Sequence, residues 1–225
     1  MNAGVIGLVQ GDFQAVDSFS DTVVEGDREL TRTLDVDRVF SLPSGQVAFE
    51  GRAAVERTAE RATAELDYGE VRVEETAATE THVTEFVGVP GEFVVTESSA
   101  GRFAFDLIGL DTGTDVERAT FDLDGFLGAH ADADVWKAGF YGADGTADSG
   151  LFHGSDLLAD DDLGDLVRRG SLNQLGLEYA YDDDRLKMTA AESGYVEVYR
   201  PTGFESADFL AYLLDEVVPH LDSTA

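Results

Sequence analysis

Negative charge is spread over the whole length of this chain, and it limits the conditions under which the chain can fold. The sequence holds 46 acidic and 15 basic residues among 225, which gives a formal net charge of -31 at pH 7. Charge of this size opposes compaction at low ionic strength, because like charges repel one another across the folded surface. At about 1 M salt the Debye length falls to about 3 Å, so most of that repulsion is screened. We therefore expect the chain to fold in concentrated salt.

The choice of basic residues supports the same expectation. Only two of the fifteen are lysines, Lys137 and Lys187. In this respect the composition resembles that of proteins from salt-accumulating halophilic archaea. The alternative is an acidic disordered tail, but the acids are not confined to one segment. Hydrophobic residues make up 43% of the chain, which is too many for disorder and enough for a substantial core.

The N-terminal apolar run indicates the cellular location, and the absence of cysteine excludes several kinds of chemistry. The run from Val5 to Val9 is too short for a signal peptide or a membrane span, and no positive charge precedes it. We expect a cytoplasmic protein without membrane association. Because the chain has no cysteine, disulfides, thiolate catalysis and cysteine-ligated zinc are excluded.

Alternating apolar residues separated by turn residues predict many strands, most of them paired in hairpins. These strands are expected over residues 5–9, 39–42, 46–49, 70–75, 83–89, 92–97, 102–110, 135–141, 150–153, 172–181, 185–189 and 194–199.

Apolar residues at helical spacing predict helices over residues 51–66 and 205–218. Acids at the start, arginines at the end and a following Gly predict a helix over residues 160–169, and we also interpret residues 115–130 as helical. Thr202 and Glu205 have the spacing of a capping box ahead of the last helix. The expected fold class is α+β: a mostly antiparallel sheet built from hairpins, with three to four helices packed on it, including a C-terminal helix. We expect a single domain over residues 1–225, and the alternative is a split into two lobes near residues 111–113, where turn residues cluster.

An acidic motif follows an apolar position at Phe121. The segment Asp122-Leu123-Asp124-Gly125 is similar to the nucleophile motif of haloacid-dehalogenase-type phosphatases, in which the first Asp attacks phosphorus, the second handles the proton and both help to hold Mg²⁺. Three observations count against this resemblance. The preceding residues do not form a buried parallel strand, Phe126 replaces the expected Thr, and only about a hundred residues follow.

Two runs of three aspartates, residues 160–162 and 182–184, could offer oxygen ligands to hard cations. Neither run has the spacing of a calcium-binding loop, and we interpret the first as a helix start and the second as a hairpin turn. The four histidines stand apart from one another, with no spacing typical of a zinc site. The sequence therefore predicts no metal site, no cofactor and no catalytic residues.

The segment from Val135 to Ala143 is unusual because it contains no acidic residue. It includes the only Trp of the chain together with Lys137 and two more aromatic residues, and aromatic side chains are enriched at protein interfaces. The predicted binding residues are Trp136, Lys137, Phe140 and Tyr141. The alternative is that this segment is an ordinary core strand.

Three classes of function remain open. We rank a non-enzymatic interaction or assembly protein first, with a protein partner or self-association through the segment around Trp136. A nucleic-acid-associated accessory protein ranks second, although the sequence shows no local cluster of basic residues. A metal-dependent hydrolase or phosphatase that uses Asp122 and Asp124 ranks third.

Overall fold

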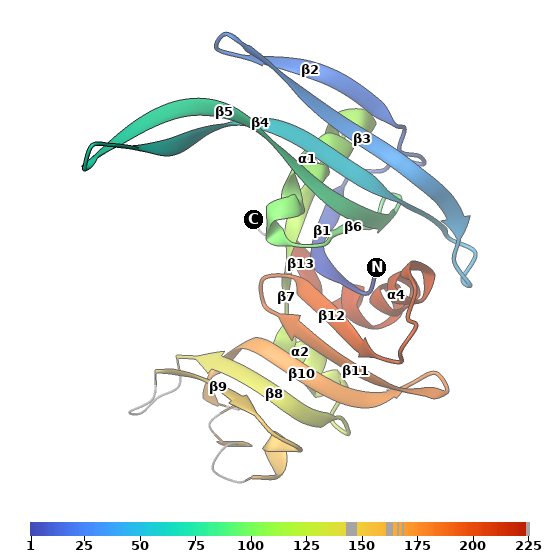
Figure 1. The fold of residues 1–225 in the computed structure, drawn as a ribbon. Coiled ribbons are helices and arrows are strands. Elements are labelled where there is room, and N and C mark those ends of the chain that lie inside the picture. Colours follow the sequence, from blue (N-terminus) through green and yellow to red (C-terminus); the bar gives the residue numbers. More distant parts are fainter. Residues whose placement is uncertain (143–147, 161–163, 166, 168, 224–225) are drawn as a thin grey trace.

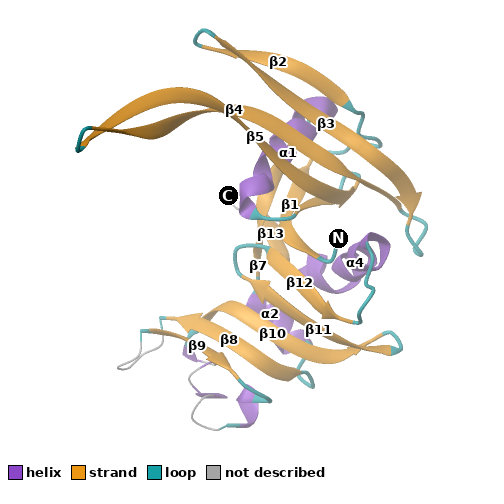
Figure 2. Ribbon diagram, viewed as in Figure 1, coloured by secondary structure: helices purple, strands orange, loops and turns teal. Residues whose placement is uncertain are grey.

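The structure, a computed structural model, describes residues 1–142, 148–160, 164–165, 167 and 169–223. It is predominantly β-structure, with 57% of the residues in strands and thirteen strands in one large antiparallel sheet (Figures 1 and 2). In the described part of the chain, the α-helices are α1 (Phe103–Thr112), α2 (Leu123–Ala129) and α4 (Ser206–Tyr212). The predicted α+β class, with three to four helices packed on the sheet, is therefore wrong. None of these helices is long and apolar enough to cross a membrane.

The strands are, in chain order, β1 (Ala3–Gln10), β2 (Phe19–Glu25), β3 (Arg28–Ser41), β4 (Val47–Asp67), β5 (Glu70–Val89), β6 (Phe93–Thr96), β7 (Asp115–Phe121), β8 (Asp134–Tyr141), β9 (Ser149–His153), β10 (Ser171–Tyr181), β11 (Asp184–Ala191), β12 (Tyr195–Arg200) and β13 (Leu221–Ser223).

Strand β1 lies at the centre of the sheet, in the order β2-β3-β4-β5-β6-β1-β12-β11-β10-β8-β9. One edge of β1 pairs with β6. The opposite edge pairs first with β12, up to Val5↔Tyr195, and then with β7, from Gly7↔Arg118 onward. Strand β7 in turn pairs with β13. The sheet therefore forks at β1, and the fork brings β7 beside the start of β12.

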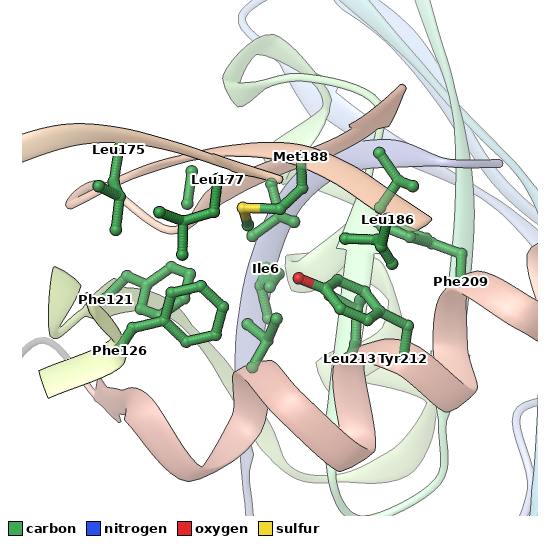
Figure 3. Packing of buried hydrophobic residues seen from close by; sticks show 14 of the residues in the cluster. Ile6, Phe121, Phe126, Leu175, Leu177, Leu186, Met188, Phe209, Tyr212 and Leu213 are labelled. Atoms are coloured by element: carbon green, nitrogen blue, oxygen red, sulfur yellow. The ribbon is translucent and has the colours of Figure 1, made fainter. Parts of the chain in front are cut away.

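Two apolar cores lie on opposite faces of this sheet. The larger lies between strands β10 to β12 and the helices α2 and α4, where Leu177 and Met188 pack towards Phe126 and Tyr212 (Figure 3). The smaller lies between the N-terminal strands and α1. Burying each large apolar side chain stabilises the fold by roughly 1.5–3 kcal/mol. In the larger core the hydroxyl groups of Tyr179 and Tyr212 form a hydrogen bond with each other, with their oxygens 3.0 Å apart.

Strands β4 and β5 extend well beyond the rest of the sheet. They pair with each other out to Asp67↔Glu70, whereas β3 pairs with β4 only as far as Val55. Residues 56–81 therefore form a projecting two-stranded ribbon, which we call the β4–β5 arm (Figure 1). Near its tip Leu66 pairs with Val71, and both side chains are exposed.

The helix predicted over residues 51–66 is wrong, because this segment lies within β4. Its Ala, Glu and Arg residues favour helix in isolation. Alternate residues such as Ala53 and Val55 instead contact the smaller core, and β5 pairs with the segment along its whole length. Tertiary packing and strand pairing override the local preference.

The strand predicted over residues 102–110 is also wrong, because these residues belong to α1. The alternation of Phe103, Phe105 and Leu107 suggested a strand, but Ala104 and Ile108 are buried as well. Neighbouring residues such as Phe103 and Ala104 point to opposite faces of a strand, whereas a helix can bury both against one core. The helix ends at Gly113, whose left-handed conformation (φ 71°) lets its N–H bond to the Gly109 carbonyl.

The remaining element predictions have mixed outcomes. Residues 115–130 form β7 followed by α2, so only the second half is helical. The capping box ahead of α4 is formed by Glu205 and Asp208, not by Thr202 and Glu205. The C-terminal helix itself is confirmed, and it continues as a π-helical turn, η3 (Leu213–Val217). The helix predicted over residues 160–169 falls partly outside the described residues.

The strand predicted over residues 5–9 and the later hairpins are confirmed. Strands β8, β9, β10, β11 and β12 match the strands expected from residue 135 onward. The turn between β10 and β11 contains Asp182 and Asp183, as predicted for the second aspartate run.

Candidate functional site

The four residues predicted to form a binding site all lie on β8, but they do not share one environment. Phe140 is buried and stacks on Phe152, with ring centres 5.8 Å apart. Trp136 and Lys137 are half-buried, and Tyr141 is 41% exposed. Phe140 therefore belongs to the core, and the surface that we describe excludes it.

A β-bulge orients Trp136. Along β8 the pairing passes from Lys137↔Gly176 to Val135↔Leu177, so that Trp136 is the extra residue. A bulge of this kind re-aims side chains and increases the local twist of the strand. Val135 and Leu177 face the larger core, while Trp136 and Lys137 both turn to the opposite face of the sheet.

The Trp136 indole lies against the backbone of β10. Its Nε1 donates hydrogen bonds to the carbonyl oxygens of Leu177 (3.3 Å) and Met188 (3.2 Å). A Cβ atom at Gly176 would lie 2.7 Å from Cε2 of this indole. Glycine at position 176 therefore leaves the space that the indole occupies.

Side chains from three other strands surround Trp136. The Lys187 Nζ lies 4.6 Å from the centre of the indole, the Tyr199 ring packs edge-on with its centre 5.8 Å away, and the His153 ring lies 6.2 Å away. Leu151 packs over Gly139 beside them and is 49% exposed. We call this surface the Trp136 face: it comprises Trp136, Lys137, Tyr141, Leu151, His153, Lys187 and Tyr199.

Carboxylates border one lysine and two tyrosines of the Trp136 face. The Lys187 Nζ lies 3.7 Å from Glu178 Oε2, and the Tyr141 hydroxyl donates to Glu192 Oε1 at 2.9 Å. The Tyr199 hydroxyl donates to Glu197 Oε2 at 3.0 Å. Burial, together with the hydrogen bond to Glu197, raises the pKa of Tyr199 to about 12. The face therefore carries cationic and anionic groups side by side around an aromatic centre.

The Trp136 face is open to solvent. On the other side of the same strands, Leu175 and Leu177 are fully buried beneath α2 and α4 (Figure 3). Helix α1 packs on the same side of the sheet as Trp136, but over the N-terminal strands; among the residues that the structure describes, it makes no core contact with β8, β9 or β10. Both lysines and the only Trp of the chain thus gather on one face of the sheet, where Tyr141, Leu151, His153 and Tyr199 are exposed.

The Asp122 and Asp124 pair lies at the start of α2. The Asp122 side chain accepts a hydrogen bond from the Gly125 N–H at 2.9 Å and caps the helix. Burial raises the pKa of Asp124, and the nearby carboxylates of Asp122 and Glu192 raise it further. The preceding strand, β7, is antiparallel to both of its neighbours. Within the described residues, no group of three or more acidic or histidine side chains is arranged to hold a metal ion.

Comparison with family models, with curated proteins and with solved structures gives no match for this chain.

Sequence reasoning located the strand that carries Trp136 but missed most of its neighbours. Leu151, His153, Lys187 and Tyr199 come from β9, β11 and β12, and only the pairing of these strands brings them together. One signal in the sequence could have indicated Lys187. It is the only lysine besides Lys137, and a residue type that is otherwise avoided marks a position where its chemistry is needed.

Proposed function

We propose that this protein is a non-enzymatic assembly protein of a salt-accumulating cell, and that it associates with a second copy of itself through the Trp136 face. The observation that carries this proposal is the gathering of the only Trp and both lysines on the Trp136 face, four of whose seven residues are exposed. Aromatic side chains are enriched in protein interfaces, because each buries a large apolar area when the two proteins bind.

The charges of the Trp136 face support a second copy as the partner. In a two-fold symmetric interface, a contact away from the symmetry axis between residue i of one subunit and residue j of its partner occurs a second time with the roles exchanged. Lys137 and Lys187 on one subunit could thus meet Glu192 or Glu197 on the other. A strongly acidic partner of a different shape would gain no such reciprocal pairing.

Concentrated salt favours contact by apolar burial. Screening at about 1 M salt removes most of the repulsion between two chains that each carry a charge of -31. Apolar burial does not depend on charge and is retained under these conditions. Trp136, Leu151 and Tyr199 provide the apolar area for it.

The oligomeric state at about 1 M KCl tests the proposal. The substitution Leu151→Asp places a charge on the Trp136 face without removing a core side chain. We expect sedimentation equilibrium to show a dimer for the wild type and a monomer for this variant. The matched control is Leu110→Asp, because Leu110 is 52% exposed on α1, away from the Trp136 face. This control should remain dimeric.

The β4–β5 arm offers the competing surface. A double substitution, Leu66→Ser with Val71→Ser, removes apolar area from the arm and should leave the dimer intact. Loss of the dimer in the arm variant but not in Leu151→Asp would contradict the proposal. A wild type that stays monomeric, and whose Trp136 fluorescence is quenched by a single-stranded oligonucleotide, would replace self-association with nucleic-acid binding.

A further inference from the structure

Three arginines line one cavity of this strongly acidic chain. The cavity has a volume of about 660 Å³ and lies between the base of the β4–β5 arm, α1 and β7. Arg57, Arg102 and Arg118 line it together with Ser99 and Asp106. We call it the arginine pocket. It thus holds three of only 15 basic residues in a chain with 46 acids.

Three separate elements position these arginines. Arg57 lies on β4, and its guanidinium group sits 5.8 Å from the centre of the Phe103 ring on α1. Arg102 directly precedes α1. Arg118 lies on β7, where the fork of the sheet brings it beside the turn before β12, and its Nε donates to the Ser193 carbonyl at 2.6 Å.

Arg102 lies close enough to Arg118 for its charge to affect the pKa of Arg118. Burial lowers the pKa of Arg118, and the positive charge of Arg102 lowers it further. Placing like charges together is unfavourable unless another group compensates them, and such arrangements concentrate at functional sites. The structure therefore places cationic groups together in a chain whose formal net charge is -31.

Two acidic residues, Asp106 and Glu117, line the pocket beside the arginines. In the described part of the chain, neither Arg57 nor Arg102 forms a salt bridge. Glu117 precedes Arg118 on a strand and pairs with Leu8, whose side chain packs on the larger core, so the Glu117 carboxylate points to the other face. Asp106 is the remaining acid of the pocket.

We propose that the arginine pocket binds a phosphoryl group, either as inorganic phosphate or as a phosphate ester. The planar guanidinium group presents paired N–H donors that match the oxygens of phosphate, and hydrogen bonds between two charged groups are the stronger ones. Arginines from three elements line this one cavity. This binding does not depend on self-association through the Trp136 face, which lies on other strands.

Titration calorimetry of the full chain with inorganic phosphate, at a constant concentration of about 1 M KCl, tests the proposal. The substitutions Arg57→Gln and Arg102→Gln should each weaken binding by about tenfold or more, because each removes a charged hydrogen-bond donor. Arg61→Gln is the matched control. It removes the same charge from the β4–β5 arm outside the pocket, and it should leave the affinity unchanged.

The substitution Asp106→Asn provides a test in the opposite direction. It removes the acid that repels a bound phosphate, so binding should tighten severalfold. A parallel titration with a nucleoside monophosphate distinguishes inorganic phosphate from a phosphate ester as the ligand. If the nucleoside monophosphate binds and inorganic phosphate does not, the ligand of the pocket is a phosphate ester. Failure of both ligands to bind the wild type would overturn the proposal. Equal weakening by Arg61→Gln, or binding of acetate as tight as that of phosphate, would also overturn it.

Discussion

The Lys187 ammonium nitrogen lies 4.6 Å from the centre of the Trp136 ring, and the two residues reach each other from strands that are not adjacent in the sheet. Strand β10 separates them, and its Gly176 leaves the space across which the indole extends. A cation above an indole contributes about 0.5–1 kcal/mol at an exposed site. The centre of the Trp136 face is therefore held by packing, by hydrogen bonds to two carbonyl groups and by this contact.

The substitution Gly176→Ala should displace the indole. The added Cβ would lie 2.7 Å from Trp136 Cε2, and overpacking of this kind costs about 1–3 kcal/mol. We expect a shift in Trp emission together with a lower free energy of unfolding in denaturant titrations. Gly128→Ala in α2 is the matched control, because a Cβ there meets no atom within 4 Å. An unchanged emission spectrum in Gly176→Ala would contradict the described position of the indole.

Tyr195 and Tyr199, whose hydroxyl groups both donate to Glu197, should lose their protons at a higher pH than a free tyrosine. Burial and Glu197 raise the pKa of both Tyr195 and Tyr199 to about 12. As pH rises above about 10, the unfolded state loses these protons first, so the stability that they contribute is present below about pH 10 and is lost towards pH 12. Absorbance titration of tyrosinate should show earlier ionisation in Glu197→Gln. Glu192→Gln is the control, and it should affect Tyr141 instead.

Folding should depend on salt concentration. Circular dichroism should show cooperative, native structure at about 1 M KCl and loss of that structure in dilute buffer, because screening removes the repulsion between the acidic side chains. The exposed ion pairs of the surface, such as Arg52 with Asp37, contribute too little to reverse this trend. Full stability in dilute buffer without divalent ions would contradict the expectation.

Asp122 should act as a helix cap and not as a nucleophile. Asp122→Ala removes the acceptor for the Gly125 N–H and should lower stability by about 0.5–2 kcal/mol. Asp122→Ser retains a capping oxygen and should lower stability much less. Thermal unfolding of the two variants measures this difference. Turnover of a generic phosphate ester with Mg²⁺ by the wild type, lost in Asp122→Asn, would contradict the capping role and favour a phosphatase.

The C-terminal half of the sheet could be predicted from the sequence because its signals are local and agree with one another. In β10 and β11, apolar residues alternate with polar ones, and the aspartate turn between them favours a hairpin. The larger core confirms this alternation, since Leu175, Leu177 and Leu186 are all fully buried.

In the N-terminal half the predicted strand over residues 5–9 and the later ones up to residue 97 fall on strands of the sheet, but the helix predicted within β4 and the strand predicted over α1 are wrong, because local preference and tertiary structure disagree there. The residues of β4 favour helix, and only their pairing with β5 makes them a strand. The two sites share this limitation. Arg57, Arg102 and Arg118 are far apart in the sequence, and their proximity depends on the fork at β1 and on the helix that α1 forms where a strand was expected.

The measurement that tests self-association most directly is acrylamide quenching of Trp136 fluorescence as a function of protein concentration. Trp136 is the only Trp of the chain, so its emission reports on the proposed interface alone. We predict that quenching decreases as the protein concentration rises at about 1 M KCl, over the same range in which sedimentation shows the mass doubling. A doubling of mass with unchanged quenching would place the interface elsewhere. A mass that remains that of a single chain at every concentration would contradict self-association itself.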